Sequence, residues 1–260
     1  MFKTISEFEN NLLNIYSNNN DAVCLHKSKW AVTIKKESIV RKYFFHLNPT
    51  KICKEVALLR LSTGIEINLI FDINSLRWYY EMPYINLYPF NINNNQQKTF
   101  DELHKIFNTW DLDKRYHELI RNDWNTVNLP YYIEILKRYL PNNQHIIDYL
   151  SNLSAEHFIH GDFTISNVYY DYAENIIVLD YENATNGPYN WDECTLAYSF
   201  IENSKYEVAQ KIINEFNCSK QMLLTISAIR LAQTRKNQND DVSRYRAYQY
   251  ICNKMICSST

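Results

Sequence analysis

Three polar residues have the order and spacing that a phosphoryl-transfer centre requires. Asp162 lies in the segment 160–167, which reads HGDFTISN, and Asn167 follows it five residues later. Asp180 ends an apolar run thirteen residues after Asn167. Phosphoryl transfer from magnesium-bound ATP needs one carboxylate to orient the accepting hydroxyl, and amide and carboxylate oxygens to hold Mg²⁺. The pattern therefore indicates a centre that transfers a phosphoryl group to a hydroxyl.

A β-hairpin is expected to position these residues. Residues 167–172 contain β-favouring valine and tyrosine, residues 173–175 (Ala-Glu-Asn) supply a turn, and residues 176–180 form a short apolar strand. A hairpin of this length returns Asp180 to the side of Asn167. Asp162 then lies on the loop just before the hairpin.

The motif resembles the signature of the aminoglycoside phosphotransferase and choline kinase superfamily, whose fold is a variant of the protein kinase fold. That signature is HGD, four further residues and Asn, then a strand that ends in Asp. A further Asp precedes a helix with a Leu-Ala pair, which corresponds here to Asp192 and Leu196-Ala197. The resemblance covers residues 157–200 and is fainter upstream.

The resemblance implies a role for each motif residue. Asp162 would be the catalytic base, Asn167 and Asp180 the magnesium ligands, and His160 a brace of the catalytic loop that belongs to the catalytic set without reacting. For Asp192, an N-cap or loop brace is favoured over a catalytic role. Glu182 is open between two interpretations, a group that reaches metal or substrate and an exposed loop carboxylate.

The rest of the chain supplies the elements of a kinase-like fold. An amphipathic helix is expected over residues 5–15 and a second helix over residues 50–61. Five strand-like segments surround the second helix: residues 22–25, 30–34, 38–45, 68–71 and 78–81. Beyond a loop at residues 91–97 the pattern is mainly helical from Phe100 onward, apart from the hairpin.

These elements predict an α+β, bilobal protein kinase-like fold. The N-lobe would be a small antiparallel β-sheet with one helix, and the larger C-lobe would be mainly helical and carry the catalytic β-hairpin. We place a nucleotide-binding lobe at residues 1–90 and a catalytic and substrate-binding lobe at residues 91–260.

A kinase-like lobe of this kind predicts an ion pair. Such sites use a lysine on the third strand to hold the nucleotide phosphates and a glutamate on the next helix to steady it. Lys42 and Glu55 occupy these places, and Arg41 would point to the opposite face because strand side chains alternate. The alternative, that Lys42 and Glu55 are surface charges, remains open.

Two further nucleotide contacts follow from the resemblance. The segment 81–85, which includes Glu81 and Tyr84, resembles the hinge between kinase lobes, whose backbone would bind adenine.

The chain departs from the kinase pattern at the phosphate-covering loop. The expected first hairpin turn at residues 26–29 (His-Lys-Ser-Lys) has no glycine, and no glycine precedes Gly64 in the sequence. The two lysines and the serine either contact phosphate or form a solvated turn.

Composition excludes several classes of protein. A net charge of −2 and a pI near 6.4 argue against binding to nucleic acid or to an anionic membrane. No stretch approaches eighteen apolar residues, and the N-terminal segment lacks the apolar core of a signal peptide. The six cysteines show no zinc spacing, which indicates reduced thiols in a cytoplasmic protein.

The leading hypothesis is an ATP- and Mg²⁺-dependent kinase that transfers the γ-phosphate of ATP, or of another nucleoside triphosphate, to a hydroxyl of a small molecule. The resemblance allows aminoglycosides, choline, ethanolamine, sugars and related metabolites. Acidic residues that could line a cationic acceptor, or could equally be solvated, are Asp192, Glu193, Glu202, Asp240 and Asp241.

Three other interpretations compete with this hypothesis. A pseudokinase that serves as an interaction module would explain the absent glycines. A protein kinase is disfavoured because Asp180 is followed by Tyr-Glu-Asn and the usual activation-segment landmarks are missing. A nucleic-acid role would rest on Arg230 and the later basic residues, a cluster that we interpret as the polar face of the terminal helices.

Overall fold

The computed structural model describes residues 22–27, 31–45, 49–73, 77–92, 96–120, 123–237 and 242–256. The helix expected over residues 5–15 lies outside these ranges, as do Ser28 and Lys29 of the expected first hairpin turn. The chain forms two compact units. The first comprises Met1–Tyr88, Asp171–Ala173 and Ile177–Glu182, and the second comprises Pro89–Tyr170, Glu174–Ile176 and Asn183–Thr260.

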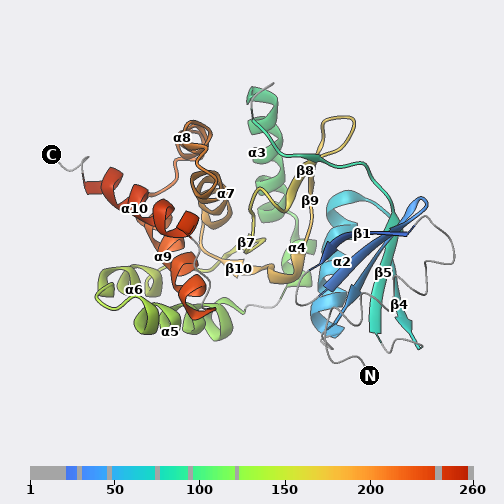
Figure 1. The fold of residues 1–260 in the computed structure, drawn as a ribbon, viewed down its shortest axis with the longest axis horizontal. Helices are drawn as coiled ribbons and strands as arrows, with labels where there is room; N and C mark the ends of the chain where they lie inside the picture. The colour runs from blue at the N-terminus through green and yellow to red at the C-terminus, as the bar shows by residue number, and fades with distance from the viewer. Residues whose placement is uncertain are drawn as a thin grey trace. The chain divides into compact units, whose positions relative to one another are not determined.

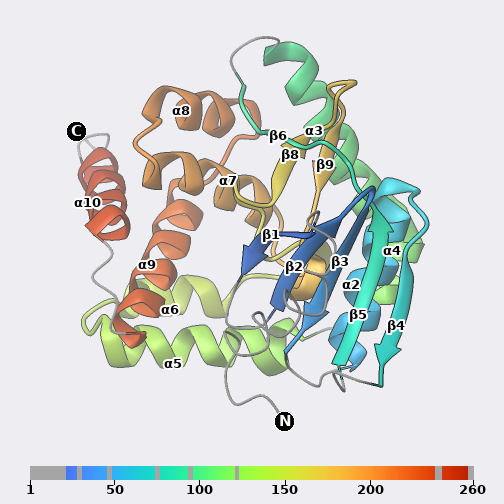
Figure 2. The ribbon, with the colours of Figure 1, turned by 45° about the vertical axis from the view of Figure 1, so that its right-hand side comes forward.

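The first unit contains an antiparallel five-stranded sheet with the strand order β1-β2-β3-β5-β4, which runs from left to right in Figure 2. Its strands are β1 (Ala22–Lys27), β2 (Ala31–Lys36), β3 (Ile39–Phe44), β4 (Asn68–Asp72) and β5 (Arg77–Pro83). Val32, Ile34 and Tyr43 are buried together on the central strands. Because side chains alternate along a strand, neighbouring residues of β3 point to opposite faces of the sheet.

One helix, α2 (Pro49–Thr63), lies against a face of this sheet (Figure 1). It begins at Pro49, whose fixed φ and missing N–H suit the first helical turn. It ends before Gly64, whose backbone has φ +67° and whose N–H donates to the Arg60 carbonyl at 2.9 Å. Its buried residues include Ile52, Val56 and Leu59, and Glu55 lies among them.

The predicted hairpin is present. Its strands are β8 (Val168–Tyr170) and β9 (Ile176–Val178), which are neighbours in a short sheet, and β6 (Tyr88–Pro89) is the third strand. Glu174 turns the chain with φ +63°. After β9 the backbone enters the left-handed region at Asp180, with φ +68°, and continues into a short 3₁₀ helix at Tyr181–Asn183.

The second unit is mainly helical. Strand β7 (His157–Ile159) pairs antiparallel with β10 (Thr185–Gly187), and the remaining elements are helices. They are α3 (Gln96–Leu112), α4 (Lys114–Leu119), a π-helical turn (Trp124–Asn128), α5 (Leu129–Tyr139), α6 (Gln144–Ser151), α7 (Trp191–Glu202), α8 (Tyr206–Glu215), α9 (Lys220–Lys236) and α10 (Val242–Ile256). The loop expected over residues 91–97 is shorter than predicted, because α3 already begins at Gln96.

Helix α9 is the centre of this unit. It contacts α5, α6, α7 and α10, and most of its residues from Met222 to Thr234 are buried. Ser219 caps its N-terminus by accepting the N–H of Met222. The predicted α+β kinase-like architecture, with one helix in the sheet unit and a mainly helical remainder, is confirmed. None of the helices among the described residues is long and apolar enough to cross a bilayer.

Candidate active site

Lys42 joins two carboxylates of the first unit. Its Nζ lies 2.7 Å from Glu55 Oε1 and 2.9 Å from Asp180 Oδ1. Arg41, the preceding residue on β3, points to the other face and bonds Glu81 at 2.7 Å. The structure thus brings Lys42, Glu55 and Asp180 together from a strand, a helix and the end of the hairpin, and gives β3 the register that the sequence predicted.

The buried pair is electrostatically coupled. Burial lowers the pKa of Lys42, but the carboxylates of Glu55 and Asp180 together with Tyr80 raise it well above its usual value. Burial raises the pKa of Glu55 to about 7, although the Lys42 ammonium acts in the opposite direction. Tyr80 adds a long hydrogen bond of 3.4 Å from its hydroxyl to Glu55 Oε1. Lys42 therefore stays cationic and is held in place from two sides.

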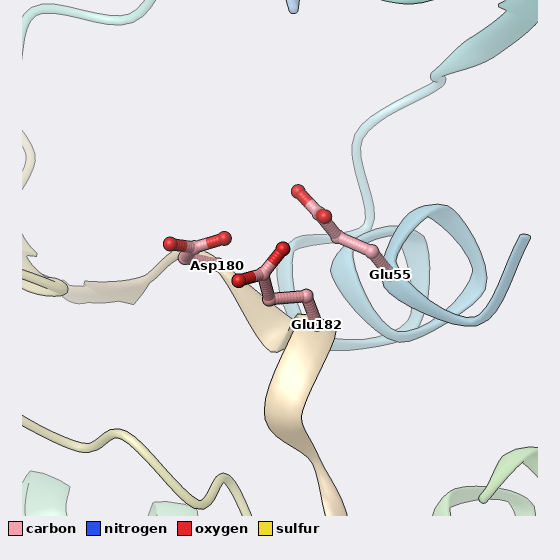
Figure 3. Close-up of side chains that lie close together, drawn as sticks. All are labelled: Glu55, Asp180 and Glu182. Carbon is pink, nitrogen blue, oxygen red and sulfur yellow. The ribbon is translucent and has the colours of Figure 1, made fainter. Parts of the chain in front are cut away.

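Three carboxylates of the first unit converge. Ligand oxygens of Glu55, Asp180 and Glu182 all lie within 4.8 Å of one another, and Figure 3 shows the three side chains reaching toward the same space. Glu55 Oε2 is buried and has no hydrogen-bond partner among the described residues. Hard carboxylate oxygens that converge in this way fit Mg²⁺. Glu55 and Asp180 each give one oxygen to Lys42, but Asp180 and Glu182 are less buried than Glu55, so these two are the side chains best suited to ligate a cation here.

The catalytic loop of the second unit presents Asp162 and Asn167 together. Asn167 Nδ2 donates to the Asp162 carbonyl at 2.8 Å and to Asp162 Oδ2 at 3.3 Å. Backbone bonds of 2.9 Å from Thr164 to Asp162 and from Asn167 to Thr164 close the turn between them. With the amide nitrogen directed at Asp162, the amide oxygen is the atom of Asn167 suited to bind a cation.

Asp192 braces this loop. It is 2% exposed in the first turn of α7 and accepts the N–H groups of His160 at 2.5 Å and Gly161 at 3.1 Å. Gly161 has φ +79°, and a Cβ there would lie 2.5 Å from the Asn183 carbonyl oxygen. Only glycine fits this position without moving the backbone. The interpretation of Asp192 as a loop brace agrees with these contacts.

His160 lies behind the loop. It is fully buried, and its Nδ1 accepts the N–H of Asp162 at 3.3 Å. Its ring stacks near Trp110, with 6.2 Å between centroids, and meets the edge of Phe163 at 5.9 Å. Such burial lets the ring orient Asp162 but not touch a substrate.

Arg230 is the residue that the sequence reasoning missed. Its Nη2 donates to Asp162 Oδ1 at 2.6 Å. The interpretation of Arg230 as part of a polar helix face is wrong, because α9 is buried on most sides. A signal was present in the sequence: Arg230 stands between Ile229 and Leu231 in an apolar stretch, where a charged side chain needs a partner.

This pairing sets the charge of Asp162. Burial raises the pKa of the carboxyl, but the Arg230 guanidinium, helped by His160 and Asn167, holds it below its usual value. Asp162 is therefore a carboxylate at neutral pH, as a group that orients an accepting hydroxyl must be.

The predicted hinge residues are engaged within the first unit. Glu81 lies on β5 between β3 and β4, where it pairs with Arg41 and Asn68. The Tyr84 N–H donates to the Ser38 carbonyl at 2.7 Å. Binding of adenine by the backbone at Glu81 and Tyr84 stays a prediction.

The acidic residues considered for a cationic acceptor are occupied or buried. Glu202 bonds Arg244 at 2.9 Å, and Asp192 is committed to the catalytic loop. Burial raises the pKa of Glu193 to about 7, with a smaller contribution in the same direction from Asp111. Asp240 and Asp241 lie outside the described residues.

Comparison with known proteins gives a result for the fold. No family model matches the sequence, and no curated protein matches it either. An amicoumacin kinase matches with a TM-score of 0.63 and 12% identity over 94% of this chain and 91% of that one. A choline/ethanolamine kinase family protein from Mesorhizobium loti matches with 0.62 and 11% identity over 96% and 94%.

A choline kinase from Streptococcus pneumoniae is also similar, with a TM-score of 0.55 and 14% identity over 95% of this chain and 98% of that one. These identities are low, so the similarity concerns the fold. The architecture, the Lys42–Glu55–Asp180 cluster and the Asp162 loop are all present in one chain. The chain therefore has the kinase-like fold that these choline kinases and aminoglycoside phosphotransferases share, as the sequence predicted.

Proposed function

We propose that the protein is a kinase that transfers the γ-phosphate of ATP, or of another nucleoside triphosphate, to a hydroxyl of a small molecule. The observation that carries this proposal is the double ion pair of Lys42 with Glu55 and Asp180. Lys42, Glu55 and Asp180 are far apart in the sequence, yet the fold brings them together. A cationic side chain that two carboxylates hold in place is suited to neutralise the charge of nucleotide phosphates. A similar amicoumacin kinase was solved with AMP-PNP and Ca²⁺, and a similar spectinomycin phosphotransferase with ADP.

In this proposal the chain's own residues carry out positioning and charge compensation. Lys42 binds phosphate oxygens of the nucleotide. Asp162 accepts a hydrogen bond from the acceptor hydroxyl, whose oxygen forms a bond to the γ-phosphorus while the bond to the β–γ bridging oxygen breaks. The electron pair leaves with the nucleoside diphosphate, and Asp162 takes the hydroxyl proton. A loose transition state needs little base strength, so a carboxylate of lowered pKa is adequate.

The acidic side chains fit a magnesium ion, as their converging oxygens indicate. When bound, Mg²⁺ would supply neutralisation of the phosphate charge that develops during transfer. Asp180 and Glu182 are the residues of the first unit that we propose to hold it, and Asn167 stays a ligand predicted from the sequence. The sequence predicted Asn167 and Asp180 as ligands, and we add Glu182 because its oxygens lie close to those of Asp180.

The central test is Mg²⁺-dependent ATP consumption in the presence of hydroxyl acceptors, with Asp162→Asn as the control. We expect one acceptor to stimulate turnover and the variant to lose about 10²- to 10⁴-fold of it, because the hydroxyl is no longer oriented by a carboxylate. ATP affinity should stay within twofold. Wild-type turnover in Asp162→Asn would contradict the role of Asp162.

The metal role of Asp180 is tested separately by calorimetry. Asp180→Ala should lose the magnesium-dependent part of nucleotide binding, which a titration of AMP-PNP with and without Mg²⁺ measures. Unchanged affinity for the magnesium complex would remove Asp180 from the metal site. A wild-type protein that binds no nucleotide at all would favour the alternative function, an interaction module without turnover.

A further inference from the structure

A cationic side chain, that of Arg230, lies beside Asp162. Arg230 reaches Asp162 from α9 with one N–H, and its side chain is 20% exposed. Among the residues that the structure describes, Asp162 is the hydrogen-bonding partner of this guanidinium. A guanidinium has five N–H donors arranged so that a second edge can bind a carboxylate or phosphate in two places. Arg230 therefore has donors to offer to another anion.

Two of the acidic groups that would favour a cationic acceptor, Asp192 and Glu202, are committed elsewhere in the second unit. Asp192 accepts two loop N–H groups and is 2% exposed. Glu202 is paired with Arg244. The charged neighbour of Asp162 is Arg230, and the guanidinium of Arg230 has N–H donors that Asp162 does not use. Such a surrounding disfavours an ammonium group close to the reacting hydroxyl and favours a negative one.

We propose that the phosphate acceptor carries a carboxylate or phosphate group near its reactive hydroxyl, and that Arg230 binds this anionic group. The inference rests on the proposed kinase function and makes Arg230 a specificity-determining residue. In this arrangement Arg230 bridges two anions: Asp162 Oδ1 at one edge and the acceptor's anionic group at the other. The hydroxyl then lies on the Asp162 side, and the bound anion fixes its direction.

The test uses hydroxyl compounds that differ only in charge. One set is glycerate, glycerol and 3-aminopropane-1,2-diol, and a larger set is gluconate, sorbitol and glucamine. Glycerol 3-phosphate and sorbitol 6-phosphate distinguish a phosphate from a carboxylate. Binding is measured calorimetrically to the full chain with Mg²⁺ and AMP-PNP present, so that turnover is not needed, and nucleotide binding is recorded first as an independent test of the proposed function.

We expect at least one anionic member to bind more tightly than its neutral and cationic counterparts. Arg230→Gln should weaken that binding about 10- to 100-fold, the value of charge-assisted hydrogen bonds, and Arg230→Lys should restore part of it. Arg235→Gln is the matched control, because Arg235 lies on the same helix and bonds the Tyr139 carbonyl. It should leave binding unchanged.

Two results would overturn the proposal while leaving the kinase function intact. One is nucleotide binding together with no preference for any anionic compound. The other is tight binding of an ammonium compound that Arg230→Gln does not weaken. A circular dichroism spectrum and thermal midpoint like those of the wild type would show that Arg230→Gln is folded. Loss of nucleotide binding in the wild type would instead count against the kinase function itself.

Discussion

The two units hold their polar residues by different means. In the first unit, one ammonium group joins side chains from three elements, and its contacts are direct ion pairs of 2.7 and 2.9 Å. In the second unit, consecutive residues of a loop are held through their backbone, by the buried Asp192 and by turns between Asp162 and Asn167. The first arrangement depends on charge, whereas the second depends on the path of the main chain together with the ion pair of Arg230 and Asp162. Variants of the two should therefore fail in different ways.

Among the variants that compare the two units, the largest effect is expected from Lys42→Met. Removal of a fixed cation at the phosphates should lower kcat/KM for ATP by about 10²- to 10³-fold, since loss of one preorganised stabilising group has that size. Arg41→Met is the matched control, because Arg41 is the neighbouring residue on the opposite face and its pair with Glu81 is partly exposed. That variant should change kcat/KM less than threefold. Equal losses in the two variants would refute the role given to Lys42.

The next effect concerns stability and the second unit. Gly161→Ala should lower the free energy of unfolding by about 2–4 kcal/mol, because a left-handed backbone carries a Cβ penalty and the Asn183 carbonyl stands in the way. Gly64→Ala offers the matched comparison, since φ there is +67° but no atom lies within 4 Å of the added Cβ. It should cost only about 1–2 kcal/mol. Urea unfolding of both variants measures the difference, and a smaller loss for Gly161→Ala would contradict the steric argument.

The smallest effect distinguishes the buried Glu55 from the partly buried Glu193 by their response to pH. Glu55 has an ammonium partner, whereas Glu193 has no ion pair within the described part of the chain. Burial raises the pKa of Glu193 from an ordinary 4.5 to about 7. Its contribution to stability is then fully present below pH 4.5 and is lost as the pH rises to 7, because ionisation is easier in the unfolded chain.

Glu193→Gln should accordingly match the wild type near pH 4 and exceed it by about 1–3 kcal/mol at pH 8. Denaturant unfolding at both pH values measures this difference. The comparison between variants cancels the titration of the groups that both proteins share. A stability difference that does not change with pH would contradict the raised pKa.

The contrast between the two units also explains which parts of the site could be predicted from the sequence. The loop of the second unit could be predicted because Asp162 and Asn167 are close in sequence and their spacing carries the geometry. The pairing of Lys42 with Glu55 was predicted because kinase-like lobes place a lysine on the third strand and a glutamate on the next helix, and strand alternation only put Arg41 on the opposite face. Arg230 could not be assigned to Asp162 in this way, because 68 positions separate them and only the packing of α9 brings them together.

The position of Glu182 could not be predicted from the sequence either, although it is only two residues from Asp180. Its position two residues after Asp180 left open whether it faced solvent or the site. The left-handed turn at Asp180 and the 3₁₀ helix that follows decide this, because they place Glu182 oxygens within 4.8 Å of those of Glu55 and Asp180. Local propensity does not predict such a backbone path. The hinge contacts of Glu81 and Tyr84 came from the resemblance alone and stay predictions.

The backbone at Asp180 limits how this position can vary. With φ +68°, it favours glycine, asparagine and aspartate, since most other side chains meet the following carbonyl. Of these three residues only aspartate is negative. Glutamate would keep the charge but would meet the steric penalty and carry its carboxylate one methylene further from Lys42. The charge and the backbone conformation together thus leave Asp180 without a conservative replacement. Any substitution here would have to be accompanied by a change in both the backbone conformation and the partner of Lys42.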